Sequence, residues 1–88
     1  MSLEELRQQI DEIDTTLVDL LNQRAQISLK IRQQKRALNR PIYDPQREQF
    51  VLQRVAAANR GPLPNQQLQD IFLLIIQSCR NLQQTQKG

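Results

Sequence analysis

Five polar side chains fall on helix faces that the sequence otherwise fills with apolar residues. They are Arg24, Lys35, Arg47, Glu48 and Gln83. A charge on such a face must reach solvent, pair with an opposite charge or bind a ligand, because an unpaired buried charge is costly. Each residue alone has a structural explanation, but five on three faces indicate a shared pocket. Cations outnumber carboxylates in it, which favours a small ligand that carries carboxylates.

The composition limits the chemistry that this pocket could perform. The chain has no histidine, so the usual general base near neutral pH is absent. Cys79 is the only cysteine, which leaves no disulfide partner and no two-cysteine metal motif. No glycine-rich phosphate loop or nucleophile elbow is present. We therefore expect no metal and no cofactor, and a reaction, if there is one, that needs little proton transfer.

The element that must position these residues is a long amphipathic helix, predicted over about residues 2–38. Ser2 and Glu5 form a capping box at its start, and Pro41 ends it because a proline disfavours helix at the preceding residue. Arg24 and Lys35 lie on the line of its apolar stripe at about 100° per residue. The apolar members of that stripe are Leu6, Ile10, Ile13, Leu17, Leu20, Ile27, Ile31 and Leu38.

This helix is too long for its own domain. About 36 residues at 1.5 Å each give a rod of about 54 Å, whereas a compact domain of this size has a diameter of about 30 Å. An antiparallel copy is the simplest cover for the overhanging stripe, so we expect an intertwined homodimer. Arg7 lies about 25 Å along the rod from Arg24. It could reach the pocket only from the partner chain.

Two shorter helices follow, over about residues 45–59 and 65–84. Asp44 and Pro45 supply an N-cap and a first-turn proline for the second helix, and Gly61 with Pro62 ends it. The apolar stripe of the third helix is Leu68, Phe72, Ile75, Cys79 and Leu82, with Gln83 at its edge. The sequence therefore predicts an all-α fold, with residues 1–88 as a single domain.

The charge pattern argues against several kinds of partner. The net charge of +3 favours anions. A DNA-recognition helix should be rich in cations, yet residues 65–84 contain only Arg80 and Asp70 as charged residues. No run of eighteen apolar residues and no signal-peptide core are present. We expect a cytoplasmic protein without nucleic-acid or membrane partners.

The order of these residues resembles the all-helical, type II chorismate mutase family called AroQ, in particular the mutase domains fused to prephenate dehydratase. The matching motifs are Leu6-Arg7-x-x-Ile10-Asp11-x-Ile13-Asp14, Leu20-Leu21-Asn22-Gln23-Arg24, Lys35, Pro41-Ile42-Tyr43-Asp44-Pro45-x-Arg47-Glu48, Gly61-Pro62-Leu63 and Phe72-x-x-Ile75-Ile76-x-Ser78-Cys79. The resemblance implies an intramolecular [3,3] rearrangement of chorismate to prephenate in phenylalanine and tyrosine biosynthesis, without cofactor or metal.

The resemblance also implies which residues hold the two substrate carboxylates. Arg24, Arg47 and Arg7 of the partner subunit would bind or orient them. Cys79 stands where some family members carry a serine near a carboxylate. A thiol is a weak hydrogen-bond donor, so we expect that contact to contribute little.

The remaining roles concern the ether oxygen and the ring. By resemblance, Lys35 and Gln83 would donate hydrogen bonds to the ether oxygen, and Asp44 and Glu48 would hold the ring hydroxyl. Lys35, Gln83, Arg47 and Glu48 are the residues expected to carry catalysis.

Two alternatives stay open for the same pattern. An isochorismate pyruvate lyase has the same fold, and Glu48 with Gln83 favours the mutase only by resemblance. A non-catalytic helical dimerisation module would also have this periodicity, although it would not require the polar residues on the apolar faces.

Overall fold

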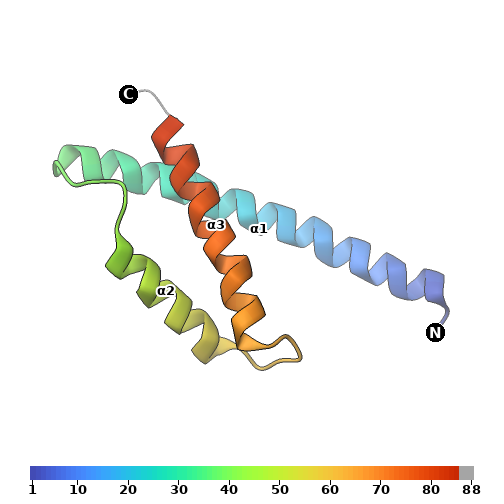
Figure 1. Cartoon of the computed structure of the whole chain (residues 1–88). Coiled ribbons are helices and arrows are strands. Elements are labelled where there is room, and N and C mark those ends of the chain that lie inside the picture. The colour runs from blue at the N-terminus through green and yellow to red at the C-terminus, as the bar shows by residue number, and fades with distance from the viewer. Residues whose placement is uncertain (86–88) are drawn as a thin grey trace.

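The computed structural model describes residues 1–85, and these form three helices without a strand (Figure 1). The helices are α1 (Leu3–Ala37), α2 (Pro45–Ala58) and α3 (Asn65–Thr85). The expected all-α fold with a very long first helix is confirmed. The ends of the helices differ from the predicted ones by one residue: α2 stops at Ala58 and α3 continues to Thr85.

Local signals explain where α1 begins and ends. The side-chain oxygen of Ser2 accepts a hydrogen bond from the backbone N–H of Glu5 at 3.1 Å, so Ser2 caps the helix instead of belonging to it. Leu38 is the cap at the other end. Asn39 then adopts a left-handed conformation with φ of 57°, which asparagine tolerates better than most residues. The chain therefore leaves α1 shortly before Pro41.

Side-chain caps also define the two connections. Asp44 Oδ1 accepts from the backbone N–H of Arg47 at 3.0 Å, and this contact opens α2. After α2, the Asn59 side chain donates to Leu63 O and Asn65 Oδ1, both at 2.7 Å, and so closes the turn into α3. Gly61 takes a φ of 74° within this turn, a conformation that glycine adopts without steric cost.

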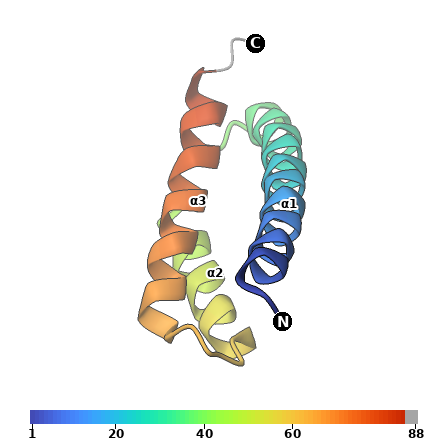
Figure 2. The same cartoon turned by 90° about the vertical axis from the view of Figure 1, so that its right-hand side faces the viewer.

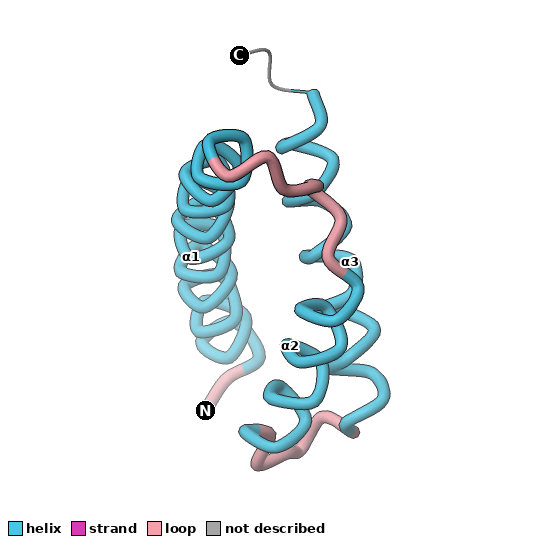
Figure 3. The backbone as a smooth tube through the Cα atoms, turned by 90° about the vertical axis from the view of Figure 1, so that its left-hand side faces the viewer, coloured by secondary structure: helices cyan, strands magenta, loops and turns pink. Residues whose placement is uncertain are grey.

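The third helix is the element that the other two share. It packs against α1 and against α2, whereas α1 and α2 do not pack on each other. Figure 2 shows α2 and α3 side by side with α1 opposite them, and Figure 3 shows the α1–α2 connection spanning the gap. The N-terminal half of α1 projects beyond both shorter helices (Figure 1), in a molecule that measures 54 × 26 × 15 Å.

Very little of this chain is buried. Among residues 1–85 the buried ones are Ser28, Ile76, Cys79 and Gln83, of which two are polar. The accessible surface is 7294 Å², about a third more than the roughly 5,400 Å² of a compact monomer of this mass. The radius of gyration is 16.0 Å, against about 12 Å for a compact domain. The apolar stripe of α1 accordingly stays exposed, with Ile10 and Ile13 each 56% accessible.

A helix that spans a bilayer must be long and apolar enough to cross its hydrocarbon core. None of the helices within residues 1–85 is long and apolar enough to cross a membrane.

Candidate active site

A cavity of about 260 Å³ lies between the C-terminal half of α1, the start of α2 and the second half of α3. Seven of the eight predicted site residues line it: Arg24, Lys35, Asp44, Arg47, Glu48, Cys79 and Gln83. Aliphatic side chains such as Ile27, Ile31 and Val51 form much of the remaining wall. The fold thus brings residues from three helices to one site, although they are up to 59 positions apart in sequence.

Arg7 is the predicted residue that this chain does not bring to the cavity. It lies on the projecting N-terminal part of α1, where its Nη1 is 3.4 Å from Glu4 Oε1. Its side chain is 66% exposed, so this ion pair is a weak surface contact. The position of Arg7 leaves its guanidinium accessible to a second molecule.

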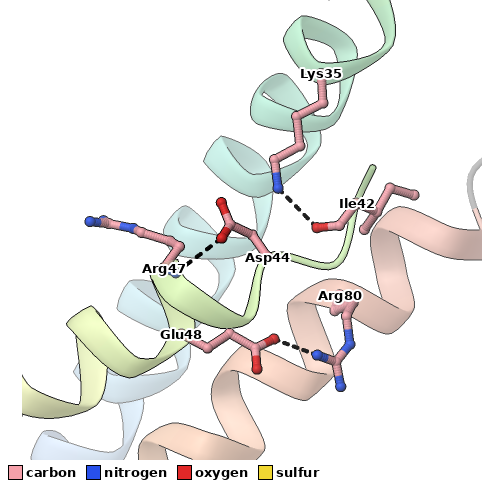
Figure 4. A network of polar contacts seen from close by, with 6 residues as sticks. All are labelled: Lys35, Ile42, Asp44, Arg47, Glu48 and Arg80. Atoms are coloured by element: carbon pink, nitrogen blue, oxygen red, sulfur yellow. Dashed lines mark hydrogen bonds and ion pairs between the residues drawn. The ribbon is translucent and has the colours of Figure 1, made fainter. Parts of the chain in front are cut away.

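Lys35 is held near the C-terminal end of α1 by the connection that follows it. Its Nζ donates to the carbonyl oxygen of Ile42 at 2.9 Å (Figure 4). An ammonium has three N–H donors, so two remain for a ligand in the cavity. The same hydrogen bond ties the α1–α2 connection to α1 at Ile42, two residues before Asp44, the N-cap of α2. Lys35 therefore both lines the site and fixes part of its wall.

Arg24 and Cys79 contact each other across the α1–α3 packing. Arg24 Nη1 lies 3.2 Å from Cys79 Sγ, and the thiol is buried. The sequence prediction considered Cys79 only as a weak donor to a ligand. In the structure its sulfur accepts from Arg24, which orients the guanidinium and leaves most of its N–H groups available. In this structure Cys79 therefore contacts Arg24, which lines the cavity.

Gln83 is buried, and two hydrogen bonds fix it. Its Nε2 donates to the backbone carbonyl of Ser28 at 2.6 Å, while Arg32 Nε donates to the backbone carbonyl of Gln83. An amide nitrogen carries two N–H groups, so one is left to donate to a ligand. A carbonyl oxygen can only accept a hydrogen bond. The side-chain nitrogen of Gln83, and not its oxygen, must therefore face the Ser28 carbonyl. The fold thus sets the amide orientation that a donor role requires.

Glu48 forms an ion pair that the sequence analysis did not anticipate. Arg80 Nη1 contacts Glu48 Oε1 across the α2–α3 packing (Figure 4). Arg80 also lies over the Tyr43 ring, 4.6 Å from its centroid. Two features of the sequence could have pointed to Arg80 as a site residue. It is one of only two charged residues in α3, and it precedes Gln83 by three positions, which places both residues on the same side of the helix.

Arg47 reaches the cavity wall from the first turn of α2. Its guanidinium lies 5.1 Å from the centre of the Phe50 ring on its own helix, and its side chain extends away from the Glu48–Arg80 pair (Figure 4).

With Arg80 included, the cavity lining holds four cations and two carboxylates. This excess of two positive charges suits a dianionic ligand. Within residues 1–85, no group of three or more His, Cys, Asp and Glu residues is arranged to hold a metal ion.

The sequence also matches a known protein family. Residues 6–84 match the model for chorismate mutase type II. The chain belongs to the chorismate mutase type II family. The resemblance that the sequence motifs indicated is therefore confirmed.

Individual members of the family support the same assignment. The bifunctional chorismate mutase/prephenate dehydratase of Aquifex aeolicus is 35% identical over 85 residues, covering 92% of this chain and 24% of that protein. The form II chorismate mutase structure from Thermus thermophilus has a TM-score of 0.93 at 28% identity and covers 98% of each chain. A Helicobacter pylori chorismate mutase, crystallised with prephenate, has a TM-score of 0.86 at 36% identity, covering 93% of this chain and 89% of that one.

The bifunctional relatives are much longer than the matched region. This chain spans about a quarter of the length of the curated chorismate mutase/prephenate dehydratases that it matches.

Proposed function

We propose that this chain rearranges chorismate to prephenate, and that the cavity between the three helices is its active site. The observation that carries the proposal is the convergence of Arg24, Lys35 and Gln83 on one cavity with an excess of two positive charges. Chorismate carries two carboxylates, so its charge matches this excess. The prephenate bound to the Helicobacter pylori relative supports the same ligand class.

Lys35 and Gln83 are the proposed transition-state donors. As the carbon–oxygen bond of the substrate breaks, negative charge builds on the ether oxygen. A fixed ammonium and a fixed amide N–H then stabilise the transition state more than the ground state. Each group already donates one hydrogen bond to a backbone carbonyl, Lys35 to that of Ile42 and Gln83 to that of Ser28. Their positions are thus set before the substrate binds.

Arg24, Arg47 and Arg7 of the partner subunit are the proposed carboxylate clamps. Holding both carboxylates restricts the flexible enolpyruvyl arm to a geometry in which the reacting carbons are close. Asp44 and Glu48 would hold the ring hydroxyl. An acceleration of about a millionfold corresponds to about 8 kcal/mol, which donors and positioning can supply without an acid or base.

The complete site requires a homodimer in this proposal. The exposed stripe of α1 gives one reason, and the charges along the helix give another. Residues 3–20 hold six carboxylates and one arginine, whereas residues 21–37 hold five cations and no carboxylate. Two antiparallel copies of α1 would place opposite charges side by side, and two parallel copies would place like charges together. The antiparallel arrangement also brings Arg7 of the partner subunit towards Arg24.

The test is product analysis with chorismate and isochorismate in parallel reactions. We expect chorismate to be consumed with formation of prephenate and no release of pyruvate from isochorismate. Pyruvate released from isochorismate would identify the lyase instead. If neither compound is consumed by the folded protein, the chain is a non-catalytic helical module and the proposed function is wrong.

A further inference from the structure

Arg80 contacts two side chains from other segments of the chain. One is Glu48 in the first turn of α2, and the other is Tyr43 in the α1–α2 connection. The side chains of the ion pair are only 23% exposed for Arg80 and 16% exposed for Glu48. This ion pair is therefore better shielded from solvent than the Arg7–Glu4 pair on the surface. Arg80 itself comes from α3, so these contacts join three segments at the cavity wall.

The contacts fix Arg80 from two directions. The Tyr43 ring supports the guanidinium through a cation–π contact, and the Glu48 carboxylate accepts a hydrogen bond from one of its N–H groups. Glu48 Oε1 is the oxygen that Arg80 engages. A carboxylate has a second oxygen with its own lone pairs, and Glu48 lines the cavity. The ion pair thus leaves one oxygen to accept a hydrogen bond from a ligand.

We propose that Arg80 is a positioning residue that holds the Glu48 carboxylate in the orientation from which its free oxygen accepts the ring hydroxyl of the substrate. This inference rests on the proposed chorismate mutase function. Without the guanidinium, the glutamate side chain has several rotamers to choose from, and its carboxylate could turn towards the cations of the cavity. Arg80 itself lines the cavity, but its proposed role is exerted through Glu48.

The effect should fall mainly on the Michaelis constant. The ring hydroxyl is neutral in both chorismate and prephenate, so a hydrogen bond to it is equally strong in the ground state and the transition state. An interaction of that kind changes KM more than kcat. Loss of a charge-assisted contact of this sort should lower kcat/KM by about tenfold or more.

The experiment compares the wild-type chain with four single variants and one double variant, and kcat and KM for chorismate are measured for each. Arg80→Met removes the charge and keeps much of the volume, while Arg80→Lys keeps the charge and should restore part of the loss. Arg54→Met is the matched control, because Arg54 is an exposed arginine outside the cavity lining. Glu48→Gln provides the background in which Arg80→Met is repeated.

In that background we expect Arg80→Met to change kcat/KM by less than about twofold, since the carboxylate through which Arg80 is proposed to act has already been replaced by an amide. An equal loss in both backgrounds would show that Arg80 does not act through Glu48 and would overturn the inference. A wild-type rate in Arg80→Met would also overturn it. If wild-type protein consumes no chorismate, the proposed function fails first and the inference fails with it.

A further variant, at Tyr43, covers the case in which the Arg80→Met protein does not fold. Tyr43→Leu removes the ring beneath the guanidinium and leaves both charges in place. It should raise KM by a smaller factor than Arg80→Met, and the increase should vanish in the Glu48→Gln background. An increase that persists there would contradict the positioning role. Circular dichroism at each step reports whether the helices are retained.

Discussion

The two halves of α1 carry the same apolar stripe but differ in what surrounds them. The C-terminal half meets α3 and the α1–α2 connection, with Arg24 bonded to Cys79, Ser28 to Gln83 and Lys35 to Ile42. Side-chain hydrogen bonds in the N-terminal half, such as Arg7 to Glu4 and Thr15 to Asp11, join near neighbours within α1. One pattern thus has two outcomes: a site wall where other helices are within reach, and an uncovered stripe where they are not.

The largest effect should come from a charge placed on the uncovered stripe. Leu17→Asp puts a carboxylate on a surface that the proposed dimer buries, at a cost of about 3 kcal/mol or more per chain. We expect dissociation, loss of helix and loss of nearly all activity. Sedimentation and circular dichroism over a range of protein concentrations measure this.

Thr15→Asp is the control for that substitution. Thr15 lies on the opposite side of α1, about 160° from Leu17. It should leave assembly and activity close to wild type. If both variants behave alike, the stripe is not the dimer surface.

The next largest effect should come from the other half of α1. Lys35→Ala should lower kcat by about a hundredfold or more and change KM little, because the proposed hydrogen bond strengthens as the ether oxygen gains charge. Steady-state kinetics with chorismate measure both constants. Lys30→Ala is the control, since Lys30 is exposed on the same helix and does not line the cavity. A Lys35→Ala variant with normal kcat and only a raised KM would rule out the transition-state role.

The two halves can be compared directly by mixing chains. Arg7→Ala and Arg24→Ala should each reduce activity strongly in pure form. In a heterodimer of the two, one site contains both arginines and the other contains neither. After random subunit exchange about a quarter of all sites should be intact, and activity should recover to about a quarter of wild type. A mixture that stays as inactive as its parents would show that the site is not shared.

The smallest effect concerns pH and depends on Gln83. An amide donates a hydrogen bond at any ordinary pH, so wild-type activity should not fall between about pH 5 and 8 through this residue. In Gln83→Glu the carboxyl group donates only while it is protonated. Activity should therefore be highest in acid and fall as the pH rises through the pKa of the new carboxyl, which is about 4.3 for an unperturbed glutamate.

Turnover measured from about pH 4.5 to 9 tests this expectation. Gln84→Glu serves as the control, because Gln84 is exposed and lies outside the cavity. Identical pH profiles for Gln83→Glu and wild type would remove Gln83 from the set of donors to the ether oxygen.

Features that depend on nearby residues could be predicted from the sequence. The capping contacts of Ser2 and Asp44 join residues three apart, and their partners are written in the sequence beside them. The apolar stripe of α1 depends only on the helical repeat. The positions of Arg24 and Lys35 on that stripe follow from the same repeat, so a polar pocket could be expected before any contact was known.

Contacts between helices could be decided only by the tertiary structure. Arg80 and Glu48 are 32 positions apart, and Gln83 and Ser28 are 55 apart. Their pairing depends on where α3 crosses α1 and on the side of α2 that it meets. Helical periodicity fixes the face on which a residue lies, but not which residue of another helix lies opposite, because many crossings bury the same apolar faces. The partners of Glu48 and Gln83 therefore followed only from the packing of α3 against its two neighbours.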